Sequence, residues 1–185
     1  MILSSLLIGS LYITWNYLLI TYQKNRILTL FNPESDPLGS GYHIIQSKIA
    51  IGSGGLTGKG LTNGSQSQLD FVPEQSTDFI FSVLAEEMGF LGFILLITIY
   101  SLIIFRCFSL SLRCEDNFSR LLGSSLTFVF FTYVFVNIGM VSGLVPVVGV
   151  PLPLISYGGS SLMTLMASFG IIMSIHKHKS LRYLQ

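Results

Sequence analysis

Long runs of apolar residues with almost no charge set the strongest limit on how this chain can fold. The run 79–105 has Glu86 and Glu87 as its only charged residues, and the run 121–141 has none. Charged residues make up 10% of the chain, against about 25% in typical soluble domains. Because about 20 apolar residues in a helix cross a bilayer, the sequence predicts an all-α integral membrane protein.

Four segments are expected to be transmembrane helices: 2–22, 79–105, 121–141 and 154–175. All six prolines fall outside them, as expected because proline breaks a helix interior. Arginines in the turn after the second segment and basic residues in the C-terminal tail place both on the cytoplasmic side. The large loop 23–78 is then expected on the outer, periplasmic side of the cytoplasmic membrane. The net charge of +1 predicts no nucleic-acid partner.

The loop 23–78 is rich in polar residues and glycine but keeps apolar residues along its length. A long loop is usually functional or disordered, and the apolar residues argue against disorder. Tyr42, Ile45 and Ile49 share one helical face, which predicts a short amphipathic helix. This helix would either lie on the membrane surface or pack against the spans.

A second loop, 142–157, is apolar yet contains three prolines. Irregular backbone at membrane depth is tolerated only against protein or a water-filled cavity. We therefore expect a re-entrant segment that lines a cavity, followed by a helix whose first N–H groups Ser160 or Ser161 could cap.

Asp78 stands at the outer end of the second span, directly before an apolar run. It could be a helix N-cap, a general base whose basicity rises at the edge of the hydrocarbon, or both. Glu86 and Glu87 lie inside that span, where ionisable residues are costly. They would either make buried structural hydrogen bonds or line a polar cavity. Because the spans contain no lysine or arginine, their partners are expected from helices supplied elsewhere.

The glycine-rich segment 52–60 does not match the Walker A pattern, because position 53 is serine and Gly60 follows Lys59. Glycine N–H groups together with Lys48 and Lys59 are candidates for holding a phosphate.

Several motifs spread over residues 32–161 resemble the SEDS family (shape, elongation, division and sporulation), which contains RodA, FtsW and SpoVE. They are Asn-Pro-Glu-Ser-Asp-Pro at 32–37, Gly-Tyr-His-Ile-Ile-Gln-Ser at 41–47, Pro-Glu-x-x-Thr-Asp-Phe at 73–79, Asn-Ile-Gly-Met at 137–140, Gly-Leu-Val-Pro-Val-Val-Gly-Val-Pro-Leu-Pro at 143–153 and Ser-Tyr-Gly-Gly-Ser-Ser at 156–161. The resemblance covers the C-terminal half of such a protein, so a partial SEDS fold is expected. The other half would contribute a charged pair within the membrane and part of the central cavity.

The resemblance implies a peptidoglycan glycosyltransferase that polymerises lipid II for cell elongation and rod shape, with Asp78 as the catalytic residue. The candidate substrate-binding residues are Lys48, Lys59, Glu74, Glu86, Ser156 and Tyr157. The implied partners are lipid II, a class B penicillin-binding protein and other membrane proteins of the elongation complex. Any Mg²⁺ or Mn²⁺ would accompany the lipid pyrophosphate, since no dedicated metal site is visible. Two alternatives stay open: a lipid II flippase, and a non-catalytic scaffold that recruits the penicillin-binding protein.

Overall fold

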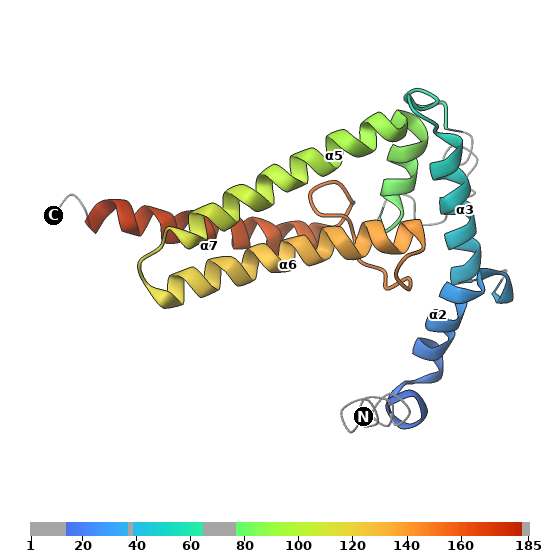
Figure 1. Ribbon diagram of the computed structural model, residues 1–185, viewed down its shortest axis with the longest axis horizontal. Helices are drawn as coiled ribbons and strands as arrows, with labels where there is room; N and C mark the ends of the chain where they lie inside the picture. Colours follow the sequence, from blue (N-terminus) through green and yellow to red (C-terminus); the bar gives the residue numbers. More distant parts are fainter. Residues whose placement is uncertain (1–13, 37–38, 65–76, 183–185) are drawn as a thin grey trace, which may run out of the picture.

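The computed structural model describes residues 14–36, 39–64 and 77–182, and this part of the chain contains helices and loops but no strand (Figure 1). The all-α prediction is thereby confirmed. In chain order the elements are the π-helical turn η1 (Thr14–Leu18), α2 (Thr21–Phe31), the 3₁₀ turn η2 (Pro33–Ser35), α3 (Ser40–Ser53), α5 (Ile80–Leu112), α6 (Asn117–Ser142) and α7 (Gly159–Arg182).

Helices α5, α6 and α7 lie side by side and enclose the apolar core (Figure 1). A row of aromatic rings joins them: Tyr100 of α5 packs edge-on against Phe130 of α6, and Phe130 packs against Phe169 of α7. Ile80–Leu112 and Asn117–Ser142 are long and apolar enough to cross a membrane. The apolar part of α7, Gly159–Ile175, is shorter.

The observed helices differ from the expected spans mainly at their ends. α5 continues past residue 105 to Leu112, and α6 begins at Asn117 rather than 121. α7 begins at Gly159, so residues 154–158, expected in the last span, belong to the preceding loop. The expected span 2–22 falls mostly outside the described residues.

Helix α3 crosses one end of the three-helix bundle and contacts α5 and α6 (Figure 1). Its buried residues are Gly41, Ile44, Ser47 and Ala50. The helix predicted around 42–51 therefore exists, but it packs against the spans, which was one of the two alternatives. The predicted apolar face was wrong, because Ile49 is 46% exposed while Ser47 is fully buried.

Small residues determine which face of α3 packs. The Ser47 hydroxyl donates to the carbonyl of Val141, 2.9 Å away, and a Cβ on Gly41 would lie 2.1 Å from the carbonyl oxygen of Pro33. Such close backbone approaches require a small side chain. Hydrophobic periodicity gives no weight to serine and glycine, so it selected the neighbouring face.

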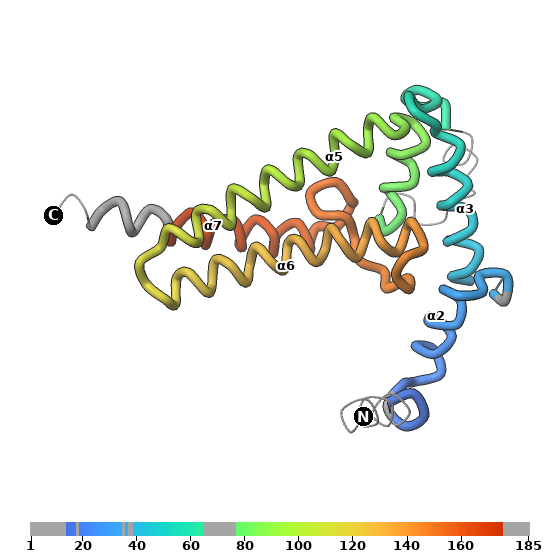
Figure 2. Tube along the Cα trace, viewed as in Figure 1, coloured from blue at the N-terminus to red at the C-terminus, as the bar shows by residue number. Residues whose placement is uncertain are grey.

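A sharp bend interrupts α5 at Gly89, whose backbone has φ 64° and ψ −158°. Figure 2 shows the bend near the start of α5, beside the C-terminal end of α3. The bend breaks the regular backbone hydrogen bonds within α5. Residues 54–60 of the glycine-rich segment replace them with hydrogen bonds from their own backbone. The carbonyls of this segment accept from the N–H groups of Phe90 and Leu91, and two of its N–H groups donate to the carbonyls of Glu86 and Glu87.

Candidate functional site

Asp78 lies just before α5 and lines two separate pockets. The helix begins at Ile80 with Phe79 in the N-cap position, and no side chain makes a capping hydrogen bond there. The simple N-cap interpretation of Asp78 is therefore wrong. The carboxylate instead stands between two cavities, where it can face a ligand.

Two side chains fix the backbone next to this carboxylate. The amide of Asn137 on α6 is fully buried and donates to the carbonyls of Asp78, at 2.8 Å, and of Val150, at 2.7 Å. The Ser156 hydroxyl donates to the carbonyl of Thr77 and accepts from the N–H of Leu152. Together they connect the start of α5 to the loop of residues 143–158, which joins α6 to α7.

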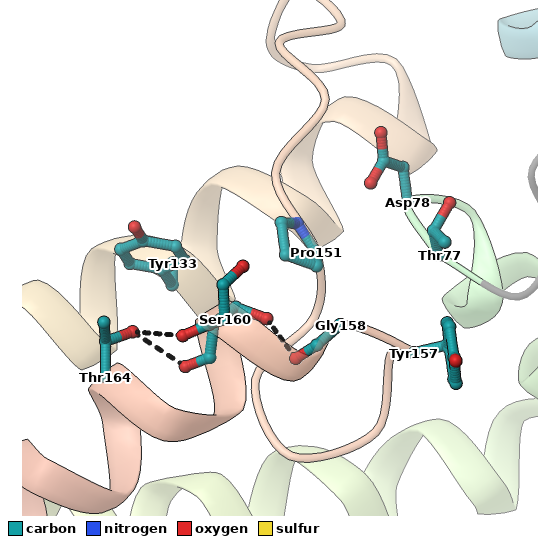
Figure 3. Close-up of a pocket in the computed structure, with 9 residues that line it drawn as sticks. Thr77, Asp78, Tyr133, Pro151, Tyr157, Gly158, Ser160 and Thr164 are labelled. Atoms are coloured by element: carbon teal, nitrogen blue, oxygen red, sulfur yellow. Dashed lines mark hydrogen bonds between the residues drawn. The ribbon is translucent and has the colours of Figure 1, made fainter.

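The first pocket, of about 700 Å³, opens between the 143–158 loop, α6 and the start of α7 (Figure 3). Its walls carry hydroxyl groups and little charge. Tyr157 is 82% exposed at its edge, and the hydroxyl of Thr164 donates to backbone carbonyls within the first turns of α7. The lining residues are Thr77, Asp78, Tyr133, Pro151, Tyr157, Gly158, Ser160, Ser161 and Thr164.

The second pocket, of about 340 Å³, is bounded by α2, the η2 turn, α3 and the loop around Gly149. Arg26 closes one side: its guanidinium lies 4.4 Å from the centre of the Tyr22 ring and donates to the Tyr22 hydroxyl and the carbonyl of Val147. The lining residues are Tyr22, Asn25, Arg26, Asp36, Gly39, Ser40, His43, Asp78, Phe79, Val147 and Gly149.

The prediction that Glu86 needs a partner from other helices was wrong. Glu86 is fully buried, and the ammonium of Lys59 lies 2.6 Å from its Oε1. Ser53 also donates to this oxygen, at 3.4 Å. The neighbouring Glu87 accepts from the N–H of Thr62 at 3.0 Å. Of the two alternatives, the structure therefore favours a buried structural interaction for Glu86, whereas the hydrogen bond of Glu87 is exposed.

The glycine-rich segment also has a structural role, and its phosphate binding stays a prediction. A Cβ on Gly54 would lie 2.1 Å from the carbonyl oxygen of Ala85, and one on Gly58 would lie 2.0 Å from that of Glu87. Gly58 also has φ 78°, a conformation that favours glycine. These glycines let the segment lie directly against the bend of α5.

The remaining predicted substrate-binding residues fall into different places. Lys48 is exposed on α3, and its side chain covers Gly143 at the end of α6, outside both pockets. The Ser156 hydroxyl donates to the backbone carbonyl of Thr77. Among the predicted substrate-binding residues that the structure describes, Tyr157 lines a pocket with Asp78. Glu74 lies outside the described residues. The predicted capping serines, Ser160 and Ser161, lie within the first turn of α7, where the Ser161 hydroxyl donates to the carbonyl of Gly158.

Among the described residues, no three histidine, cysteine or acidic side chains are grouped to hold a metal ion. A divalent cation stays an expectation tied to the pyrophosphate.

Two residues of the site, Asn137 and Arg26, were not predicted to act in it. A polar residue inside an apolar span is a signal for Asn137. Nothing in the sequence around Arg26 indicates its role, because its hydrogen-bond partner Val147 is 121 positions away in the chain.

Comparisons with known proteins agree on one family. A family model described as cell cycle protein, covering FtsW, RodA and SpoVE, matches residues 1–181. Peptidoglycan glycosyltransferase MrdB of Escherichia coli K12 is 59% identical over 91% of this chain and 46% of its own length. Peptidoglycan glycosyltransferase RodA of Treponema pallidum is 47% identical over 84% of this chain and 36% of its own length. The chain therefore spans about half or less of these relatives.

Two solved structures are also similar. A chain from a study titled "Structural coordination of polymerization and crosslinking by a peptidoglycan synthase complex" gives a TM-score of 0.71 at 37% identity, over 95% of this chain and 48% of that one. The crystal structure of an aspartate-to-alanine mutant of Thermus thermophilus RodA gives a TM-score of 0.53 at 41% identity, over 56% of this chain and 35% of that one. The chain is thus a membrane protein that belongs to the FtsW/RodA/SpoVE (SEDS) family and corresponds to part of a complete member.

Proposed function

We propose that this chain carries the catalytic base of a peptidoglycan glycosyltransferase that polymerises lipid II, with Asp78 as that base. One observation carries the proposal: Asp78 lines two pockets at once, and a polymerase must bring two glycan substrates together at one group. The curated relatives are named peptidoglycan glycosyltransferases, which agrees with this chemistry.

In the proposed reaction the Asp78 carboxylate takes the proton of an acceptor sugar hydroxyl. The acceptor oxygen then bonds to the anomeric carbon of the donor, and the bond from that carbon to the pyrophosphate oxygen breaks. Undecaprenyl pyrophosphate leaves with the electron pair, and Asp78 later releases its proton to water. General base catalysis of this kind contributes about 10²–10⁴ in rate.

Fixed geometry supports the role of Asp78. The hydrogen bonds from Asn137 and Ser156 hold the backbone carbonyls on either side of the Asp78 Cα, which limits where the carboxylate can move. A catalytic group held close to its reacting atoms loses little rate to misorientation. Ser156 is thus a positioning residue in this proposal, and Tyr157 is a candidate for direct substrate contact.

The test compares wild type with Asp78→Asn, reconstituted with a class B penicillin-binding protein and given fluorescent lipid II. The matched control is Asp116→Asn, an exposed carboxylate in the turn between α5 and α6, at the opposite end of α5. We expect loss of polymer with Asp78→Asn and normal polymer with Asp116→Asn. Undiminished polymer from Asp78→Asn would refute the catalytic assignment.

When the protein is reconstituted in lipid vesicles, measuring both polymer and the movement of lipid II between leaflets separates polymerisation from transport. A flippase would move lipid II between leaflets with or without the Asp78 carboxylate. Glu86 and Glu87, which first suggested a transport path, are engaged by Lys59 and Thr62, so they do not favour this alternative.

A class B penicillin-binding protein is the proposed partner, because the neighbouring structure comes from a complex that couples polymerization and crosslinking. We further propose the cytoplasmic membrane as the location, with the segment around Asp78 on its periplasmic side, where lipid II is polymerised. A scaffold without catalysis would bind this partner equally well with Asp78→Asn and would show no turnover.

A further inference from the structure

We infer that the second pocket, formed by α2, the η2 turn and α3, is the subsite for the acceptor sugar. This inference rests on the proposed glycosyl transfer, and it assigns a substrate to one side of Asp78. The first pocket would then take the donor.

The position of the carboxylate distinguishes the two pockets. A Cβ built on Gly149 would lie 3.2 Å from Oδ2 of Asp78, and Gly149 lines the second pocket but not the first. In Figure 3 the Asp78 carboxylate points away from Tyr157, which lines the first pocket. A hydroxyl in the second pocket is therefore well placed to give its proton to Asp78.

The charges of the two pockets are similar. Asp36 and Asp78 both line the second pocket, and Arg26 is the cation among its described lining residues. Arg26 already contacts Tyr22 and the carbonyl of Val147. With Arg26 counted, the second pocket has two carboxylates and one guanidinium, and the first has one carboxylate and no cation among its described lining residues. Charge therefore does not separate the two pockets, and the assignment of the acceptor rests on the position of the carboxylate and on the size and polar groups of the second pocket.

The polar groups of the second pocket suit sugar hydroxyls, which both donate and accept. Asn25 provides an amide, Asp36 a carboxylate and Ser40 a hydroxyl. The volume of about 340 Å³ is near the lower end for ligand pockets, which fits a sugar ring without its lipid.

The test measures binding of an N-acetylglucosamine oligosaccharide, free of lipid and pyrophosphate, by saturation-transfer NMR on the full chain in nanodiscs. Asn25→Ala removes one exposed polar group of the pocket, on a helix that tolerates alanine. We expect about fivefold weaker binding, the effect of one net hydrogen bond. Asp36→Asn, which keeps the size of the side chain, is a second variant expected to weaken binding. Thr21→Ala on the same helix, outside both pockets, is the matched control and should bind as wild type does.

The inference would be overturned if the wild-type protein did not bind the sugar. It would also be overturned if Asn25→Ala and Asp36→Asn bound the sugar as well as wild type does. Asp78→Asn should still bind the sugar within about threefold, because most of the pocket's contacts remain. The two proposals can therefore fail separately. Polymer formed by Asp78→Asn would refute the catalytic base, whereas unchanged sugar binding by the pocket variants would refute the acceptor subsite.

Discussion

Removing one partner of the ion pair between Lys59 and Glu86 should cost much stability, because the buried Glu86 carboxylate would lose its cation. The pair joins the glycine-rich segment to the bend of α5. The ammonium and the carboxylate oxygen are 2.6 Å apart, and the Glu86 side chain is 0% exposed. Lys59→Met keeps most of the apolar stem and removes the charge. The buried carboxylate would then lose its cation, or the segment would have to open and admit water.

The expected cost follows from burial. Removing one partner of a buried ion pair costs about 3–5 kcal/mol. The Lys59 side chain is 29% exposed, so water already screens part of the interaction, and we expect the lower end, about 3 kcal/mol. Such a loss is large against a typical total stability of about 5–15 kcal/mol.

This loss of stability can be measured by unfolding the protein in mixed micelles of mild detergent and sodium dodecyl sulfate, with circular dichroism as the signal. The double variant Lys59→Met/Glu86→Gln is the key comparison, because it removes both charges. It should recover at least about 1 kcal/mol relative to the single variant, since no uncompensated charge stays buried. A single variant within about 0.5 kcal/mol of wild type, or a double variant no more stable than the single, would refute the reasoning.

Four further changes test other parts of the structure. Gly89→Ala should cost about 2–3 kcal/mol in the same unfolding assay, because the backbone angles there are almost exclusive to glycine and the new Cβ would lie 2.3 Å from the nitrogen of Gly58; a change below about 1 kcal/mol would contradict this. Asn137→Ala should cost about 2–3 kcal/mol, because two buried carbonyls lose their donor, and a neutral effect would mean that water replaces the amide. Ser156→Ala should lower kcat for polymerisation with little change in KM, because the hydroxyl holds the backbone beside Asp78; a rise in KM alone would indicate substrate contact instead. Lys48→Ala should keep polymerisation within about twofold, since its side chain covers the end of α6 away from both pockets, and a loss as large as that of Asp78→Asn would restore its predicted phosphate role.

The helices of the bundle could be predicted from the sequence because their cause is local. Runs of apolar residues identify α5 and α6, and the prolines identify the 143–158 loop as irregular. The boundaries shifted because polar residues at helix ends continue the hydrogen-bonded turns, as in α6 from Asn117.

The contacts that form the site join residues that are far apart in the chain. Hydrophobic periodicity describes near neighbours in the sequence, so it does not predict these contacts. Lys59 and Glu86 are 27 positions apart, and Ser156 and Thr77 are 79 apart. Asp78 was identified as a candidate base because a carboxylate at the start of an apolar run is conspicuous, and the family motif supports it. Its two pockets could not be predicted, because α2, α3 and the 143–158 loop meet only in the folded chain.

The most direct measurement is lipid II polymerisation by this chain, with a class B penicillin-binding protein and the N-terminal half of a family member supplied together. Polymer should form when both halves are present and should vanish when this chain carries Asp78→Asn, because the proposed base lies in this chain. Polymer formed at the wild-type rate by the Asp78→Asn chain would show that another group takes the proton, and the proposed mechanism would be wrong.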